Sequence, residues 1–169
     1  MIEFDDAMSS VMSEEDVSNS ARKFILRNFW EAGQSTYIYE ATQYNLKRPD
    51  LLVFIEYQSP RRQWTIHAVE SKVRRRYLTV SDRRYICSGV KQSRSYKANY
   101  RWLAISKEVY RDMYDEEWRK LKRDCKGTDR NTGLLVCYKT KVDEVIRAGY
   151  HLGSWIQYYR DQDWILEDL

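Results

Sequence analysis

Several features that would assign this chain to a class of proteins are missing from its sequence. No apolar run approaches the roughly 20 residues that a membrane-spanning helix needs. The first residues have neither the basic start nor the apolar stretch of a secretory signal. The three cysteines are odd in number and widely spaced, which leaves no CxxC pair for zinc and no disulfide framework. We therefore expect a cytoplasmic protein whose cysteines serve as small hydrophobic residues.

Histidine is also scarce. The chain has only His67 and His151, so a histidine metal site or a Ser-His-Asp triad has little to build from. What is present suits a packed globule, because 43% of the residues are hydrophobic and 14% are aromatic. At 169 residues, the chain fits one domain, or one domain with an appendage.

Positive charge is concentrated in one stretch of the chain. Residues 61–101 hold twelve basic residues and only two acids, Glu70 and Asp82. Residues 1–16 hold six acids and no base, and the net charge of the whole chain is only +4. A local basic field of this kind attracts phosphate backbones, although a solvated surface would have the same composition.

Apolar spacing predicts alternating helices and strands. Val17, Ala21 and Ile25 recur at four-residue intervals, so one stripe of the first helix should face a core. The apolar run from residue 51 to residue 55 is typical of a strand that is covered on both faces. Gly89 is the point at which the second helix would be interrupted. We expect helices over residues 13–32, 80–99 and 107–126, and strands over residues 37–41, 50–57, 64–73, 101–106 and 133–138.

This order of elements predicts an α/β fold with a mixed central sheet of four to five strands flanked by helices. A helix that returns between two strands implies a crossover connection, which makes part of the sheet parallel. We expect the domain to span residues 13–150, after a flexible acidic leader over residues 1–12. An aromatic, acidic tail follows over residues 151–169. The sequence leaves open whether this tail packs on its own domain, pairs two subunits as a homodimer or binds another protein.

Two carboxylates and one lysine fall at the ends of neighbouring predicted strands. Asp50 lies at the start of the second strand, and Glu70 and Lys72 lie near the end of the third. Residues two apart on a strand point to the same face, so Glu70 and Lys72 project together while Ser71 faces the opposite way. If the two strands pair as a hairpin, Asp50 joins that face.

These residue types suit phosphodiester hydrolysis. The carboxylates of Asp50 and Glu70, with a backbone carbonyl such as that of Ser71, offer the oxygen ligands that Mg²⁺ prefers. Such a cation polarises a phosphate and lowers the pKa of a bound water, and the Lys72 ammonium would neutralise developing charge. A structural salt bridge between Glu70 and Lys72 is the alternative interpretation.

The residues Pro49-Asp50 and Glu70-Ser71-Lys72 resemble the signature of the PD-(D/E)xK nuclease superfamily. Its members include restriction endonucleases, Holliday-junction resolvases and many repair nucleases. The resemblance implies a restriction-endonuclease-like core, a mixed sheet flanked by helices. It also implies that Asp50 and Glu70 bind Mg²⁺ or Mn²⁺ and that Lys72 assists the attacking water.

The triplet of acid, any residue and lysine is a weak signal by itself, because the sequence repeats it as Asp124-Cys125-Lys126. That copy ends a charged helix and follows no apolar strand. The first copy ends an apolar strand and begins 20 residues after Asp50. Strand context therefore separates the candidate site from the accidental copy.

Further positions can be assigned from the resemblance, which extends over residues 13–140. The downstream order of a basic helix, a strand, a helix and another strand fits the family. Gln92, with Tyr96 one turn later, resembles a glutamine that supports the lysine or contacts substrate phosphate in several branches. A solvated amide is the alternative for Gln92.

Three acids are additional candidates near the metal. Many family members place a glutamate early in the first helix, where Glu14 or Glu15 stands here, although helix capping explains either residue equally. Glu40 lies on the strand that precedes Asp50, and a surface ion pair with Lys47 or Arg48 explains it as well.

Basic residues follow the candidate site directly. Arg74, Arg75 and Arg76 come just after Lys72, which would place guanidinium groups beside the scissile phosphate. Tyrosines interleave with the basic residues of the next helix, a mixture suited to phosphate contacts or to stacking on unpaired bases. The predicted nucleic-acid-binding residues are Arg74, Arg75, Arg76, Arg83, Arg84, Lys91, Arg94 and Lys97.

Taken together, these patterns predict a Mg²⁺-dependent DNA endonuclease or DNA-processing nuclease that does not act at a membrane. RNA remains open as a substrate. One alternative is a non-catalytic nucleic-acid-binding protein on the same scaffold. Another is a protein that assembles a larger complex through its aromatic tail, with the acids serving only in salt bridges.

Overall fold

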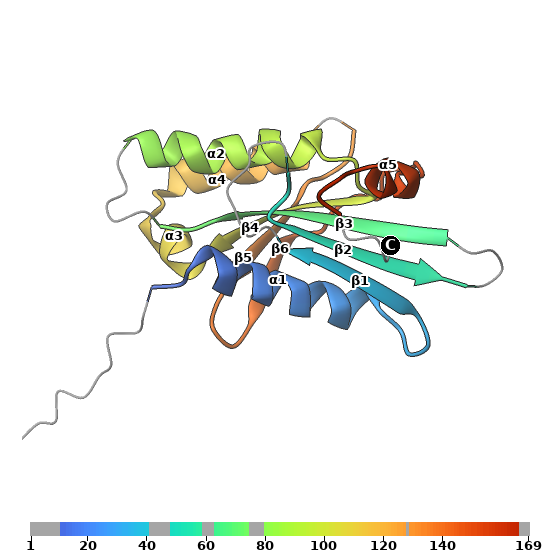
Figure 1. The fold of residues 1–169 in the computed structure, drawn as a ribbon. Helices are drawn as coiled ribbons and strands as arrows, with labels where there is room; N and C mark the ends of the chain where they lie inside the picture. Colours follow the sequence, from blue (N-terminus) through green and yellow to red (C-terminus); the bar gives the residue numbers. More distant parts are fainter. Residues whose placement is uncertain (1–10, 41–47, 59–62, 75–79, 128, 166–169) are drawn as a thin grey trace, which may run out of the picture.

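The computed structural model describes residues 11–40, 48–58, 63–74, 80–127 and 129–165, and it describes side chains for all of these except residues 80–83. They form one open sheet of six strands with helices on both faces (Figure 1). The strands lie side by side in the order in which they occur in the chain.

The two halves of the sheet differ in strand direction. The antiparallel half contains β1 (Ser35–Glu40), β2 (Leu51–Tyr57) and β3 (Gln63–Lys72). β4 (Tyr100–Ser106) and β5 (Gly133–Cys137) run parallel to β3, and β6 (Val142–Ile146) returns antiparallel to β5. Parallel neighbours require crossover connections, and here helices provide them. The carboxyl ends of β3, β4 and β5 therefore meet at one end of the sheet.

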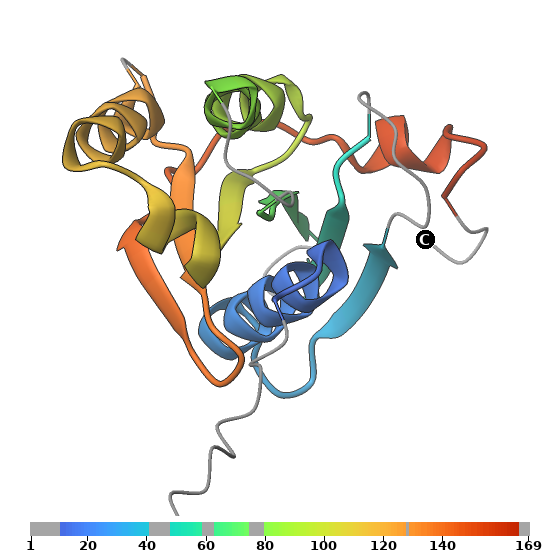
Figure 2. The ribbon, with the colours of Figure 1, turned by 90° about the vertical axis from the view of Figure 1, so that its left-hand side faces the viewer.

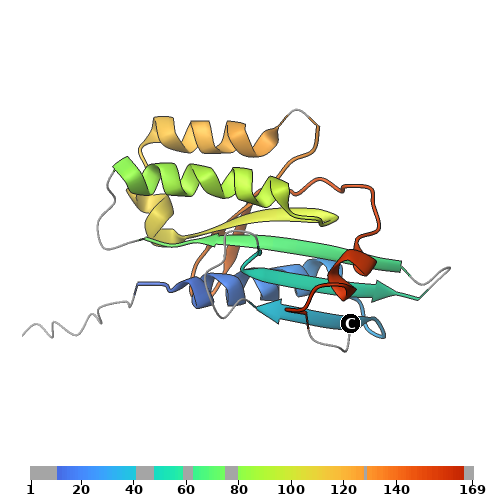
Figure 3. The same cartoon turned by 45° about the horizontal axis from the view of Figure 1, so that its top comes forward.

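Helices cover both faces of the sheet. α1 (Glu14–Phe29) crosses one face, whereas α2 (Val80–Ser95) and α4 (Asp115–Lys126) lie on the other (Figures 1 and 2). The short helix α3 (Lys107–Asp112) directly follows β4. The short helix α5 (Ile156–Arg160) lies over β2 and β3, on the same face as α2 (Figure 3).

α1 begins at a side-chain cap and buries one stripe. The hydroxyl of Ser13 accepts a hydrogen bond from the Asp16 amide at 3.1 Å, and the Asp16 carboxylate accepts one from the Ser13 amide at 2.9 Å. This capping box satisfies amides that the helix itself leaves unpaired. Val17, Ala21 and Ile25 are completely buried against the sheet, as their spacing predicts.

Alternate residues of β2 contribute to opposite faces of the core. Leu51, Val53 and Ile55 belong to the apolar cluster beneath α1. Leu52 and Phe54 belong to a second cluster, which packs beneath α5. A third cluster lies under α2, α3 and α4. The prediction of an α/β fold with a mixed sheet and a strand covered on both faces is confirmed.

The number of strands was predicted wrongly. The sheet has six strands rather than four to five, because residues 142–146 pair with β5 as β6. β6 lies at the edge of the sheet and contains Asp143 and Glu144, and only Ile146 of its five residues is buried. A strand that packs on one face needs few apolar residues, so a search for apolar runs misses it.

Helix boundaries also differ from the prediction. α1 ends at Phe29 rather than at residue 32, because local hydrogen bonds form a turn instead: the Trp30 indole donates to the Gln34 carbonyl at 2.8 Å. The expected helix over residues 107–126 is two helices, since the Glu117 carboxylate accepts from the Tyr114 amide at 3.0 Å and caps a new start. α2 runs through Gly89 without interruption.

The C-terminal tail packs on its own domain in the part that the structure describes. Tyr159 and Ile165 are 2% and 8% exposed, and both join the cluster that contains Leu52 and Phe54. Met12, which the expected leader includes, is buried beneath α1. Within the described ranges, no helix has the length and apolar character needed to cross a membrane.

Candidate active site

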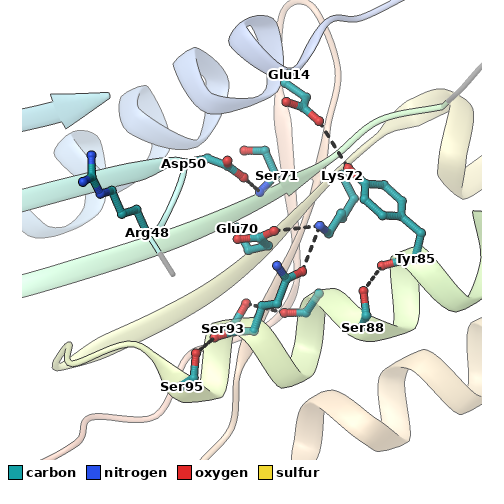
Figure 4. Close-up of polar contacts among 12 residues, drawn as sticks. Glu14, Arg48, Asp50, Glu70, Ser71, Lys72, Tyr85, Ser88, Ser93 and Ser95 are labelled. Atoms are coloured by element: carbon teal, nitrogen blue, oxygen red, sulfur yellow. Dashed lines mark hydrogen bonds and ion pairs between the residues drawn. The ribbon is translucent and has the colours of Figure 1, made fainter. Parts of the chain in front are cut away.

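The pairing of β2 with β3 brings Asp50 and Glu70 together. Leu51 pairs with Val69, and the Asp50 amide donates to the Val69 carbonyl oxygen at 3.0 Å. Moving one residue outward from the first pair places Asp50 opposite Glu70. Figure 4 shows both carboxylates at this end of the sheet, next to the amine of Lys72.

Glu70 and Lys72 form a buried ion pair. The Lys72 ammonium lies 2.6 Å from Glu70 Oε1 and donates to Gln92 Oε1 on α2 at 3.0 Å. Glu70 and Lys72 are only 3% and 1% exposed. The ring of Tyr85, also on α2, has its centre 4.0 Å from the ammonium. Because a buried charge without a partner is strongly destabilising, these contacts fix the position of the lysine.

The second oxygen of Glu70 is occupied by a tyrosine. The Tyr96 hydroxyl, just beyond α2, donates a hydrogen bond to Glu70 Oε2. Burial raises the pKa of Tyr96 far above its ordinary value, and the negative charge of Glu70 raises it further. The phenol therefore stays protonated and acts as a donor that fixes the orientation of the carboxylate.

Asp50 has a raised pKa. One of its oxygens, Oδ2, accepts a hydrogen bond from the Ser71 amide at 2.6 Å. Burial raises the pKa of Asp50 to about 7, the charge of Glu70 adds to this, and the Ser71 hydrogen bond opposes it. Burial disfavours the charged form of Asp50, and the nearby carboxylate of Glu70 disfavours it further.

Ser71 faces the opposite side of the sheet, as the alternation along a strand predicts. Its hydroxyl lies 2.9 Å from the Ser18 hydroxyl of α1, and both residues are buried. The side chain of Ser71 therefore contacts α1 rather than the carboxylates. A role of Ser71 in metal binding would use its backbone carbonyl.

The additional acids lie in different surroundings. The Glu14 carboxylate accepts a hydrogen bond from the Tyr85 hydroxyl at 3.2 Å, and its charge contributes to the raised pKa of Asp50. Glu14 therefore borders the site (Figure 4). Glu15 is exposed in the first turn of α1. Glu40 forms an ion pair with Arg22 of α1 at 3.0 Å, so its surface partner lies on the helix rather than among the basic residues before Asp50.

The predicted nucleic-acid-binding residues whose side chains are described are all exposed, and three of them also contact other parts of the protein. Arg74 pairs with Asp112 at 3.1 Å. Arg94 donates to the Asp124 carbonyl of α4, and the Lys97 ammonium lies 4.1 Å from the centre of the Tyr158 ring. The exposed residues of α2 include Arg84 and Lys91. Arg75 and Arg76 lie outside the described residues, as does the side chain of Arg83.

Sequence reasoning identified the charged residues of the site but missed contacts that hold them. The donor role of Tyr96 is one, and the link from Ser18 to Ser71 is another. A weak signal for the first was present, because Tyr96 lies one turn after Gln92. No local pattern distinguishes Ser18 from the other serines of α1.

Few side chains of the candidate site could bind a metal ion directly. Within the described ranges, no group of three or more histidine, cysteine, aspartate or glutamate side chains is arranged to hold a metal ion. Asp50 and Glu70 converge as a pair, with the backbone of Ser71 between Glu70 and Lys72. No protein-family model matches the chain, and no curated protein matches its sequence.

Proposed function

We propose that this chain is a Mg²⁺-dependent nuclease that hydrolyses phosphodiester bonds in DNA. The observation that carries this proposal is the convergence of Asp50, Glu70 and a buried Lys72 at the carboxyl end of β3. A buried ion pair contributes little to stability compared with apolar residues of the same size. Perturbed carboxyl groups beside such a pair are typical of sites that use their charge.

The residues of the site fit a hard divalent cation. Asp50 and Glu70 would supply carboxylate oxygens, and Ser71 would supply its carbonyl oxygen. Positive charge between the two carboxylates would relieve the repulsion that contributes to the raised pKa of Asp50. When bound, Mg²⁺ or Mn²⁺ supplies Lewis-acid chemistry at the phosphate and lowers the pKa of water.

The remaining residues position charge for the reaction. The Lys72 ammonium would neutralise the charge that develops on phosphoryl oxygens as the attacking oxygen approaches and the leaving oxygen departs. Gln92 holds that ammonium in place, and Tyr96 holds one oxygen of Glu70. Exposed Arg84 and Lys91 on α2 would contact the DNA backbone nearby.

We also propose that the protein acts in the cytoplasm, and we propose no protein partner for it. The three cysteines are free, which fits a reducing compartment such as the cytoplasm. The described part of the tail packs on the domain itself, so we do not propose that it forms a dimer interface or binds another protein.

The test is a cleavage assay with matched variants. Purified wild-type protein is incubated with plasmid, linear duplex and single-stranded DNA, in Mg²⁺, Mn²⁺ or EDTA. Asp50→Asn and Glu70→Gln, which keep side-chain shape but remove the charge of the ligands, are purified in parallel. We expect metal-dependent cleavage by the wild type and a loss of about 100-fold or more in each variant.

Two results would contradict the proposal. Equal cleavage by the wild type and both variants would show that a contaminant or another site is responsible. Binding of DNA without cleavage in any metal would favour the non-catalytic nucleic-acid-binding alternative.

A further inference from the structure

A groove separate from the carboxylates lies between α1 and the turn that joins β5 to β6. Its volume is about 540 Å³. Lys23 and Arg27 line it from α1, and Lys139 and Lys141 line it from the turn. None of the lining residues is acidic. The groove therefore has basic side chains on both walls, and all four lie outside the basic stretch of residues 61–101.

The two walls are held together by backbone and side-chain contacts. The Tyr138 amide donates to the Lys141 carbonyl at 2.9 Å, which closes the turn. The Ser20 hydroxyl on α1 lies 3.5 Å from the Tyr138 carbonyl oxygen. The Lys141 ammonium lies 4.6 Å from the centre of the Tyr138 ring and 3.1 Å from the Asp143 carboxylate at the rim. These contacts hold the turn beside α1 and fix the position of Lys141.

The arrangement of charge favours an anion between the walls. Lys23 and Arg27 are one helical turn apart on an exposed surface, a spacing at which like charges are destabilising. The lysines of the turn add positive charge from the other side. An anionic ligand would lower this repulsion and gain hydrogen bonds from several donors at once.

The groove and the candidate active site lie on opposite faces of the sheet, because α1 lines the groove whereas Lys72 contacts Gln92 of α2. In strand order, the two are nevertheless near each other. Lys72 pairs with Ile105 on β4, and Ser106, the next residue, pairs with Cys137 on β5. The turn therefore begins two strands away from Lys72, which at the usual strand spacing is about 10 Å.

We infer that this groove binds the phosphate backbone of DNA, with Lys23, Arg27, Lys139 and Lys141 as its phosphate contacts. The choice of DNA as the ligand rests on the proposed function. The groove itself supplies affinity rather than catalysis, so the two proposals can fail separately.

The experiment measures DNA affinity in EDTA, where no cleavage occurs. The groove variant replaces all four basic residues with glutamine: Lys23→Gln, Arg27→Gln, Lys139→Gln and Lys141→Gln. A matched control removes four exposed charges from α4 on the opposite face of the sheet: Arg119→Gln, Lys120→Gln, Arg123→Gln and Lys126→Gln. The probe is a fluorescein-labelled 20-nucleotide DNA, single-stranded or paired, in whichever form the wild type binds more tightly.

We expect the groove variant to bind at least about tenfold more weakly than the α4 control at moderate salt. The slope of log affinity against log salt should become shallower by about two to four in the groove variant, since each phosphate contact contributes roughly one. Both variants should show the far-ultraviolet circular dichroism of the wild type, because every replaced side chain is exposed.

An equal loss in both variants would overturn the inference, because it would reflect net charge alone. Failure of the wild type to bind DNA would overturn it too. If the wild type binds but never cleaves, and the groove variant still loses affinity selectively, the nuclease proposal fails while the groove inference stands.

Discussion

Two copies of the same sequence pattern have opposite environments in this fold. Glu70-Ser71-Lys72 ends β3, and all three residues are buried. Asp124-Cys125-Lys126 ends α4, where the cysteine is buried and the lysine is exposed. On a strand, residues two apart share a face, whereas on a helix they point in very different directions. The pattern acquires chemical meaning only from the element that carries it.

The largest difference between the two copies is expected when the lysine of each is removed in turn. Lys72→Ala should reduce cleavage by about 100-fold to 1000-fold, because it removes the charge placed beside the carboxylates. It should also lower the free energy of unfolding by about 3–5 kcal/mol, since Glu70 is left buried without its partner. Lys126→Ala, the matched control, should change stability by less than about 0.5 kcal/mol and leave cleavage intact. Plasmid nicking and urea unfolding measure the two effects.

A second variant separates charge from folding. In the double variant Glu70→Gln, Lys72→Met, both buried charges are gone, so stability should recover toward that of the wild type. Cleavage should remain absent. Cleavage by this folded double variant would show that neither residue takes part in the reaction.

The first acids, Asp50 of the candidate site and Asp124 of the helical copy, can be compared through the pH dependence of stability. Burial and Glu70 raise the pKa of Asp50 to about 7 in the folded protein, above its ordinary value of 3.8. The folded state therefore holds this proton more tightly than the unfolded chain, and stability falls as pH rises from about 4 to about 7. Asp50→Asn should therefore stabilise the protein more at pH 8 than at pH 5, by about 1–3 kcal/mol.

The control for that prediction is Asp124→Asn, on the helical copy of the pattern. Its effect on the free energy of unfolding gives the baseline against which the pH dependence of Asp50→Asn is compared. Urea unfolding at the two pH values tests both variants. A stabilisation by Asp50→Asn that is equal at pH 5 and pH 8 would contradict the raised pKa of Asp50, and with it the burial of this carboxyl beside Glu70.

A smaller effect is expected where α2 approaches Lys72. Alanine is favoured over glycine in a helix by about 1 kcal/mol, but a Cβ atom at Gly89 would lie 2.8 Å from Leu103 Cδ1 and 3.1 Å from Lys72 Cε. Gly89→Ala should therefore destabilise the protein by about 1–2 kcal/mol and slow cleavage about tenfold by displacing the lysine. Ser88→Ala, at the exposed neighbouring position, should leave cleavage unchanged, as nicking assays would show.

The smallest effect concerns an acid that sequence reasoning placed near the metal. Glu40 forms a partly exposed pair with Arg22, so Glu40→Gln should change stability by less than about 0.5 kcal/mol. Cleavage should be unaffected. A loss of about 100-fold in a nicking assay would show instead that Glu40 reaches the metal during the reaction.

The sequence was sufficient to place the charged residues of the site because their positions depend on local pattern. β2 and β3 begin or end within one residue of the prediction, and the hairpin register then sets Asp50 opposite Glu70. The two-residue periodicity of a strand is enough to place the side chains of Lys72 and Ser71 on opposite faces of the sheet. These features depend on apolar alternation, which is readable without a structure.

Other contacts depend on the reach of side chains across the fold, which no local pattern encodes. Arg74 was expected beside the substrate phosphate, and no local pattern indicates that it also pairs with Asp112 of α3. Arg94 was expected to bind nucleic acid, and its contact with the end of α4 was likewise not predicted. β6 was missed because an edge strand with acidic residues has no long apolar run. Each of these outcomes is set by neighbours that are distant in sequence.

The packing of the C-terminal tail has a consequence for synthesis of the chain. Leu52 and Phe54 lie beneath Tyr159 and Ile165, which leave the ribosome roughly 100 residues later. At about 5–20 residues per second, this patch of the nascent protein stays uncovered for roughly 5–20 s. During that interval the hairpin exposes an apolar surface, which favours aggregation of the nascent chain unless a chaperone covers it.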